Sequence, residues 1–193
     1  LVESLVRQHS AVAEAAGVRI VALVRQEAYA MADGLMLVRV LSNLMDNAIK
    51  FSRPGTTVLV ALRSGRTHWR LQVRDAGVGI ASEAQAHIFE EFVQMHNDAR
   101  DRRQGLGLGL AIARRLALLM NGDITVRSAL GRGTCMTVRM PCVQAPPDDV
   151  DARTNAQRGI SVPGALLPMA GVPWPTPSFT MQHVMLVEDD SLV

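Results

Sequence analysis

Residues 37–51 have the pattern of a helix with one buried face. Apolar side chains recur there at steps of three and four residues, namely Leu37, Leu41, Leu44, Ala48 and Phe51. Asn43, Asn47 and Lys50 fall together on a flank about a quarter-turn from that face. Amide oxygens can complete the coordination shell of a Mg²⁺ ion held by phosphates, and a lysine can neutralise those phosphates. An ordinary amphipathic helix with a solvated flank fits the same pattern.

Composition and charge give no sign of a nucleic-acid-binding, disulfide-rich, zinc-binding or membrane-spanning protein. The chain has 193 residues, enough for one domain of ordinary size and the beginning of another, and 48% of them are hydrophobic. A formal charge of +2 without a long basic run gives no indication of nucleic-acid binding. Cys135 and Cys142 match neither a disulfide framework nor a zinc site, and no apolar run approaches the ~20 residues that cross a bilayer. We therefore expect the chain itself to be soluble and to lie in a reducing compartment, the cytoplasm, while membrane attachment of its parent protein stays open.

Periodicity and turn residues predict a mixed order of helices and strands. Helices are expected over residues 1–16, 34–52, 82–88 and 111–120. Strands are expected over residues 18–24, 28–31, 56–63, 67–74, 124–128 and 134–140, the last four as two hairpins. Gly17 ends the first helix, Asp33 caps the second and Ser82 caps the third. The apolar positions predicted for the first helix are Leu1, Leu5, Val12 and Ala16.

A carboxylate and two glycines at alternate positions, Asp75, Gly77 and Gly79, follow directly on one predicted strand. This spacing lets the backbone turn sharply and lets a flat ligand lie against it. A carboxylate accepts hydrogen bonds but cannot donate them, so it selects a ligand edge with a donor, such as the exocyclic amine of adenine. A tight loop without a ligand fits the same motif.

A second glycine cluster, at Gly105, Gly107 and Gly109, leads into the helix over residues 111–120. Glycines at a helix N-terminus leave N–H groups free to point at phosphate oxygens, and the helix dipole favours the same charge. The polar stretch before it, 93–104, has no periodicity, which predicts a mobile loop. The cluster lacks the Lys-Ser/Thr pair of a P-loop and the preceding strand of a dinucleotide fingerprint, so neither fold is indicated.

In this order, the motifs resemble the catalytic ATP-binding domain of sensor histidine kinases, which belongs to the superfamily of gyrase, mismatch-repair and chaperone ATPases. NLMDNAIKFS looks like the family's N box, DAGVGI and GLGLGLAI look like its two glycine boxes, and IFEEFVQ looks like its phenylalanine box. GDITVRSALGRGTCMTV looks like the closing hairpin. The resemblance implies a two-layer α/β (α+β) sandwich, in which a mixed, mostly antiparallel sheet packs on helices and a flexible lid covers ATP.

The resemblance also implies roles for individual residues. Asn47 would hold Mg²⁺, Asn43 would line the same site, and Lys50 would meet phosphate; these three form the implied catalytic set. Asp75 would bind the adenine amine, and Thr134 would support adenine through water. The implied cofactor-binding set is Phe51, Asp75, Gly77, Gly79, Gly105, Gly107, Gly109 and Thr134.

The residue at position 43 bears on the reaction. The gyrase and chaperone branches carry a glutamate there, four residues before the Mg²⁺ asparagine, where it activates water. Asn43 cannot act as that base. The resemblance therefore implies transfer of the γ-phosphoryl group of Mg-ATP to a histidine of a partner helix, within a phosphorelay. Two alternatives stay open, a nucleotide-binding interaction module that signals without phosphotransfer and a stand-alone ATPase.

The resemblance also divides the chain. Residues 1–16 would be the tail of a dimerisation hairpin, 17–142 the ATP-binding domain, 143–180 a Pro-rich linker and 181–193 the first strand of a truncated response-regulator receiver, as in a hybrid kinase. His9 does not match the context of the family's phosphorylated histidine. We therefore expect a monomeric fragment that binds ATP without phosphorylating itself, from a homodimeric parent whose hairpin and receiver are its partners.

Overall fold

A computed structural model describes residues 1–24, 29–65, 67–93 and 107–142, and the backbone of 182–185. The helices are α1 (Val2–Ala15), α2 (Gly34–Phe51), α3 (Ser82–Gln85) and α4 (Gly109–Leu119). The strands are β1 (Arg19–Val24), β2 (Tyr29–Ala32), β3 (Thr57–Ser64), β4 (His68–Arg74), β5 (Asp123–Ala129), β6 (Gly133–Pro141) and β7 (Gln182–Met185). Three predicted segments lie wholly or largely outside the described residues: the loop over 93–104, of which only residue 93 is described, the linker over 143–180, and most of 181–193. Within the described ranges, no helix combines the length and the apolar character needed to cross a membrane.

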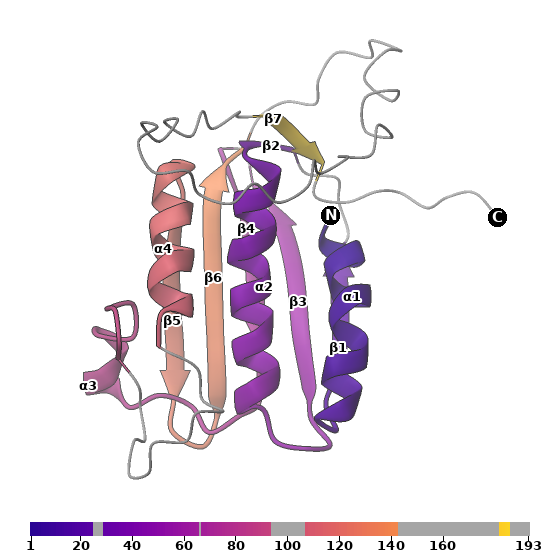
Figure 1. Cartoon of the computed structure of the whole chain (residues 1–193), viewed down its shortest axis with the longest axis vertical. Coiled ribbons are helices and arrows are strands. Elements are labelled where there is room, and N and C mark those ends of the chain that lie inside the picture. The colour runs from indigo at the N-terminus through magenta and orange to yellow at the C-terminus, as the bar shows by residue number, and fades with distance from the viewer. Residues whose placement is uncertain (25–28, 66, 94–106, 143–181, 186–193) are drawn as a thin grey trace, which may run out of the picture.

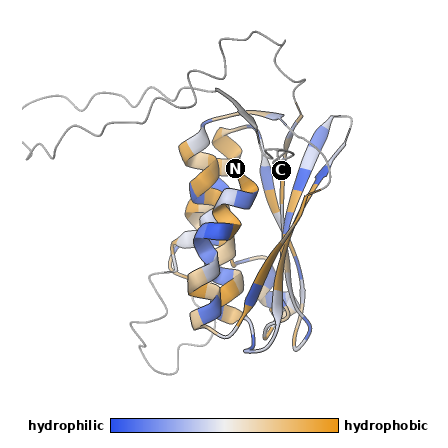
Figure 2. Ribbon diagram, turned by 90° about the vertical axis from the view of Figure 1, so that its right-hand side faces the viewer, coloured by the Kyte–Doolittle hydropathy of each residue, from blue (hydrophilic) through white to orange (hydrophobic). Residues whose placement is uncertain are grey.

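Two layers make up the domain, a five-stranded sheet and the helices that cover one of its faces (Figures 1 and 2). The strand order is β1-β3-β4-β6-β5. Strand β1 pairs with β3 in parallel, and the other neighbours pair antiparallel. Helices α1, α2 and α4 lie side by side in front of the sheet in Figure 1. This arrangement confirms the predicted two-layer sandwich with a mixed, mostly antiparallel sheet.

Alternation along the strands explains why one face of the sheet is covered. In β4, Trp69, Leu71 and Val73 are at most 1% exposed, whereas Arg70 and Arg74 between and beyond them are exposed on the other face. Burying one large apolar side chain contributes about 1.5–3 kcal/mol, so the helices must cover the apolar face. Within the described residues, no helix covers the opposite face, which we call the open face of the sheet (Figure 2).

Helix α2 begins where Asp33 caps it. Oδ1 of Asp33 accepts a hydrogen bond from the N–H of Met36 at 2.9 Å and satisfies one first-turn donor, as predicted. The buried face contains the predicted residues Leu37, Leu41, Leu44 and Ala48. The prediction that Phe51 extends this face is wrong, since its side chain is 44% exposed. Phe51 is the last residue of the helix, and its ring lies 4.9 Å from Nζ of Lys50.

Helix α1 packs against β1 and α2 and shares the core of the sheet. Its buried residues are Val2, Leu5, Val6 and Ala13. Of the predicted apolar positions, Leu5 is buried and Leu1 packs against the core. The second half of the predicted face is wrong, since Val12 is 57% exposed and Ala16 is exposed. The reason is His9, which occupies the middle of the buried stripe and interrupts the apolar pattern there. The assignment of this helix to a dimerisation hairpin stays a prediction.

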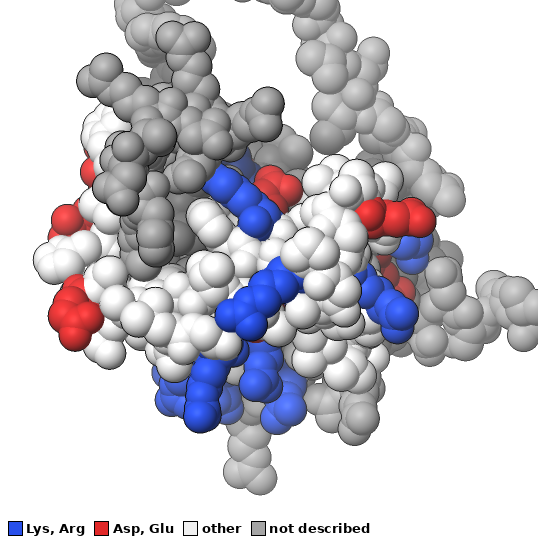
Figure 3. All heavy atoms as spheres, turned by 90° about the horizontal axis from the view of Figure 1, so that it is seen from below, with Lys and Arg blue, Asp and Glu red and all other residues white. Residues whose placement is uncertain are grey.

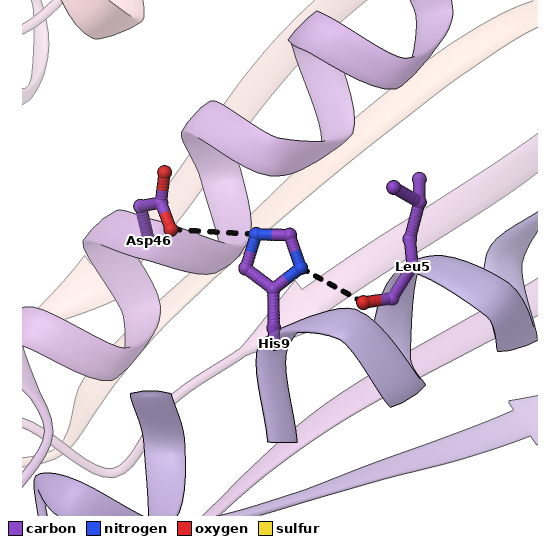
Figure 4. Close-up of polar contacts among 3 residues, drawn as sticks. All are labelled: Leu5, His9 and Asp46. Atoms are coloured by element: carbon purple, nitrogen blue, oxygen red, sulfur yellow. Dashed lines mark hydrogen bonds and ion pairs between the residues drawn. The ribbon is translucent and has the colours of Figure 1, made fainter. Parts of the chain in front are cut away.

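His9 joins α1 to α2 (Figure 4). Its ring is nearly buried, with the side chain 12% exposed. Nδ1 lies 2.8 Å from the carbonyl oxygen of Leu5, and Nε2 lies 3.3 Å from Oδ1 of Asp46 on α2. A carbonyl only accepts, so Nδ1 donates its proton to Leu5. The contact with Asp46 is an ion pair when the ring carries both protons.

Two smaller elements depart from expectation. Strand β2 lies outside the five-stranded sheet and pairs antiparallel with β7, with Ala32 opposite Gln182. The strand predicted near the C-terminus is thus seen over Gln182–Met185, and its assignment to a receiver stays a prediction.

Helix α3 spans only Ser82–Gln85. The predicted cap at Ser82 is wrong because Ser82 is already the first helical residue, and Ala81 precedes it without a side-chain cap.

Candidate nucleotide site

Asp75 lies at the end of β4 and is 8% exposed. Its Oδ1 accepts hydrogen bonds from the backbone N–H groups of Gly77 at 2.8 Å and Thr134 at 3.1 Å. Within the described part of the chain, no hydrogen bond reaches Oδ2. Burial raises the pKa of Asp75 above the ordinary value of 3.8, and hydrogen bonds from backbone N–H groups oppose that rise. One carboxylate oxygen therefore fixes the side chain, and the other can accept from a ligand.

Close backbone contacts hold the loop after Asp75. A β-carbon on Gly77 would lie 2.1 Å from the carbonyl oxygen of Phe51. Gly79 has φ +73°, and a β-carbon there would lie 2.0 Å from the carbonyl oxygen of Ala129. Any other residue would have to displace backbone at either position. The two glycines thus clamp the loop between the end of α2 and the turn that joins β5 to β6.

Ser128 and Thr134 form a polar network behind this loop. Oγ of Ser128 accepts from the N–H of Ile80 at 2.8 Å, donates to the carbonyl oxygen of Gly133 at 2.9 Å and lies 2.9 Å from Oγ1 of Thr134. Ser128 has one hydroxyl proton, and it donates this proton to the hydrogen bond with Gly133. Thr134 must therefore be the donor in the bond between the two hydroxyls. The remaining capacity of the Thr134 hydroxyl is to accept. Like Asp75, Thr134 can therefore receive a proton donor of a ligand.

Sequence reasoning missed two residues of this network. Ser128 lies on β5, and Gln85 lies on α3, where its Nε2 donates to the carbonyl oxygens of Ile80 and Ser128 at 3.0 Å each. Two of their hydrogen bonds join residues distant in the sequence, Ser128 with Ile80 and Gln85 with Ser128. The closing-hairpin motif contains Ser128, but no local pattern distinguishes it from a surface serine.

The polar flank of α2 faces the start of α4. Asn43 and Asn47 are half-buried and one helical turn apart, and Lys50 is exposed. Oδ1 of Asn43 lies 3.4 Å from the position of a β-carbon on Gly109, the first residue of α4. Nδ2 of Asn43 is buried and has no hydrogen-bond partner in the described part of the chain. A buried donor without a protein partner indicates a place for a ligand or an ordered water.

The N-terminus of α4 has no side-chain cap within the described residues. The residue before it, Leu108, provides no side-chain cap, and Gly107 has φ +70°. The first-turn N–H groups of a helix without such a cap are available to an anion. Gly105, the first glycine of the predicted cradle, lies outside the described residues.

The end of α2, the end of β4, the turn between β5 and β6 and the start of α4 all lie in the lower half of the molecule in Figure 1. Asp75, Gly77, Gly79 and Thr134 form one group, and Asn43 with Gly109 forms another. The end of α2 links them, since Phe51 contacts the loop of Gly77. Hydrogen-bond acceptors thus lie in the first group, and an uncapped helix N-terminus and a buried amide lie in the second. Together they define a candidate nucleotide-binding domain.

Comparison with known protein families supports a nucleotide-binding domain. Residues 32–144 match the family described as histidine kinase-, DNA gyrase B-, and HSP90-like ATPase. The chain belongs to this family, and it contains the catalytic ATP-binding domain of a histidine kinase.

Curated relatives and solved structures give the extent of the similarity. Over 120 residues, the chain is 39% identical to the sensor histidine kinase RppB of Synechocystis sp., covering 62% of this chain and 26% of RppB. Over 109 residues, it is 42% identical to the sensor histidine kinase RcsC of Escherichia coli, covering 56% of this chain and 11% of RcsC. The chain therefore spans a small part of the length of these relatives.

Two solved structures share the fold. Full-length ShkA in complex with AMPPNP matches with a TM-score of 0.62 and 30% identity, over 76% of this chain and 30% of ShkA. The mycobacterial sensor histidine kinase MprB matches with a TM-score of 0.62 and 28% identity, over 74% of this chain and 95% of that chain.

Proposed function

We propose that this domain binds Mg-ATP and transfers its γ-phosphoryl group to a histidine on the dimerisation hairpin of a hybrid sensor kinase. The observation that carries the proposal is the acceptor-only character of the floor, made by Oδ2 of Asp75 and the hydroxyl of Thr134. Adenine presents an amine to such a floor, whereas guanine presents a carbonyl at the same ring position. The domain is therefore expected to prefer ATP to GTP.

The second group of residues suits the phosphates. The uncapped first turn of α4 would donate N–H groups to phosphate oxygens, and Lys50 would neutralise their charge. Among the described residues, no cluster of three or more His, Cys, Asp or Glu could hold a metal. Mg²⁺ would thus be held by the phosphates together with the amide oxygen of Asn47, and Asn43 would line the same site. Bound Mg²⁺ supplies charge neutralisation for the transferring phosphoryl group.

Residue 43 favours transfer over hydrolysis. Asn43 is half-buried between α2 and α4, and its amide cannot take a proton from water. The chain's own residues would then position ATP and neutralise charge, while the acceptor histidine comes from another domain. We infer that the partners are a histidine-bearing hairpin and a receiver domain, that the parent is a homodimer and this fragment a monomer, and that the reaction takes place in the cytoplasm.

Phosphotransfer to a separately supplied hairpin of the parent kinase tests this proposal. The chain, radiolabelled Mg-ATP and the hairpin should give a phosphohistidine on the hairpin, and Asn47→Ala should abolish the label. Thr125→Ala, an exposed position on β5, is the matched control that should keep it. ATP binding without label on the hairpin would instead indicate an interaction module. Sustained phosphate release by the chain alone would indicate an ATPase.

A further inference from the structure

The open face of the sheet, which is turned away from the helices, carries a concentration of arginines. Six exposed arginines alternate with core residues on its strands, namely Arg19, Arg63, Arg70, Arg74, Arg127 and Arg139. Among the described residues of these strands, Asp123 is the one carboxylate on the same face. Figure 3, which views the molecule from its lower end, shows Lys and Arg side chains gathered along the lower edge without Asp or Glu among them.

The sheet register places several of these arginines directly opposite one another. Arg63 pairs with Arg70, and Arg70 pairs with Arg139, across three adjacent strands. Arg74 and Arg127 flank Cys135 of β6 from its two sides and form a second row. Cys135 is four residues before Arg139 along β6, so the second row lies about 13 Å from the first. Like charges directly opposite each other on a sheet repel and lower stability. The sheet therefore holds two positive rows in an arrangement that a counter-charge would stabilise.

The described part of the chain places one carboxylate beside these rows, since Asp123 of β5 lies directly opposite Arg139 in the register. None of the ion pairs in the described residues, however, involves Asp123 or any of the six arginines. Arg139 reaches only His68, with its guanidinium 3.3 Å from Nδ1 of the ring. Between the rows, Gln72 and Thr137 pair with each other at 3.4 Å. A coherent positive field of this kind attracts an anionic partner and raises its association rate.

An apolar patch on β1 and β3 lies next to the arginines of the open face. Val21 and Leu23 on the edge strand β1 are 36% and 42% exposed. In the register they lie beside Leu59 and Ala61 of β3. The outward positions of the five strands include no Phe, Tyr or Trp on which nucleic-acid bases could stack. The face thus offers an apolar patch on β1 and β3, with Arg19 and Arg63 at its ends, beside the arginine rows.

We propose that the open face is a docking surface for an acidic, amphipathic segment of a partner protein. Its apolar side chains would cover Val21 and Leu23, and its carboxylates would pair with the arginine rows, most directly with Arg70 and Arg139. The surface lies behind the sheet, on the side opposite α2 and α4, so a docked partner leaves the candidate nucleotide site free (Figures 1 and 2).

A fluorescent peptide tests the proposal, with Leu at helical spacing and Glu at the remaining positions. Its binding to the full chain is followed by anisotropy. The double variant Arg70→Glu/Arg139→Glu should bind it about tenfold more weakly or worse, which corresponds to about 1.4 kcal/mol. The matched control is Arg39→Glu/Arg115→Glu, which changes the same charge at exposed positions of α2 and α4 and should bind like the wild type. Leu23→Ser should weaken binding without any change of charge.

Several results would overturn the proposal. Equal weakening by the two double variants would mean that net charge alone attracts the peptide. Absence of peptide binding at about 1 mM would mean that there is no such surface. Binding of anionic lipid vesicles or of oligouridylate that depends on Arg70 and Arg139, without peptide binding, would assign the face to a membrane or to RNA. Thermal unfolding and ATP titration of each variant show that it is folded and separate this test from the proposed function.

Discussion

Thr134 donates its hydroxyl proton to Ser128 across 2.9 Å, because Ser128 gives its own proton to the carbonyl oxygen of Gly133. Because Thr134 uses its one hydroxyl proton in this bond, its hydroxyl oxygen can only accept a hydrogen bond from a ligand. Asp75, held through Oδ1, also presents an acceptor. The floor of the candidate site is therefore built to receive hydrogen-bond donors. Ser128 sets this preference by fixing the direction in which the Thr134 hydroxyl points its proton.

Ser128→Ala should therefore act on both stability and binding. The variant leaves the N–H of Ile80 without its acceptor and lets the Thr134 hydroxyl rotate, so the free energy of unfolding should fall by about 1–3 kcal/mol. ATP affinity should fall as well. Urea unfolding and calorimetry measure the two effects, with Thr125→Ala on the exposed side of β5 as the control. A variant with unchanged stability and affinity would contradict the assigned bond directions.

Alanine substitutions at Gly79 and Gly131 distinguish the cost of a steric clash from the cost of backbone strain. Both have positive φ, +73° and +74°, but a β-carbon on Gly79 would meet the carbonyl oxygen of Ala129, and one on Gly131 would meet nothing within 4 Å. Gly131→Ala should cost about 1–2 kcal/mol for the left-handed conformation alone. Gly79→Ala should cost clearly more and should weaken ATP binding. Equal losses in the two variants, measured by urea unfolding, would show that the loop after Asp75 is not clamped.

Stability should depend on pH through Asp75. Burial raises the pKa of Asp75 in the folded protein above its ordinary 3.8, so the folded state holds the proton more tightly than the unfolded state. The contribution of Asp75 to stability is therefore full below pH 3.8 and is lost as the pH rises through the raised value. Asp75→Asn does not titrate and should gain stability relative to wild type across that window. A difference in unfolding free energy that stays constant with pH would contradict this sign.

His9→Ala tests whether α1 is an integral part of the domain. The variant removes the contacts with Leu5 and Asp46, and the free energy of unfolding should fall by about 0.5–1.5 kcal/mol, plus the loss from packing. Gln8→Ala, at an exposed position of the same helix, is the control. Unchanged stability in His9→Ala would mean that the contact between α1 and α2 contributes nothing measurable.

Local sequence patterns predicted most of the fold. The capped helix α2 and both hairpins are confirmed, because a short-range rule determines each of them: a side-chain cap at Asp33, an apolar period of 3.6, or a glycine turn between alternating strands. The same rules erred where one side chain breaks the period. His9 interrupts the stripe of α1, and Phe51, the last residue of α2, keeps the period of its stripe but is exposed.

The candidate site was less accessible to such reasoning. Asp75 and the glycines were found because they form a compact motif in the sequence. Ser128 and Gln85 were missed because their partners are far along the chain, and only the folded sheet brings them together. The rows of arginine on the open face were missed for the same reason. They emerge from the pairing register of four strands and from no single stretch of sequence.

Calorimetric titration of Mg-ATP and Mg-GTP into the chain and into Asp75→Asn is the decisive test of the adenine site. ATP should bind the wild type much more tightly than GTP does. Asp75→Asn should stay folded and lose about 10-fold to 100-fold in ATP affinity, as expected for one hydrogen bond to a charged group. Equal binding of ATP and GTP, or an Asp75→Asn variant that binds ATP as well as the wild type, would contradict an adenine site built on Asp75.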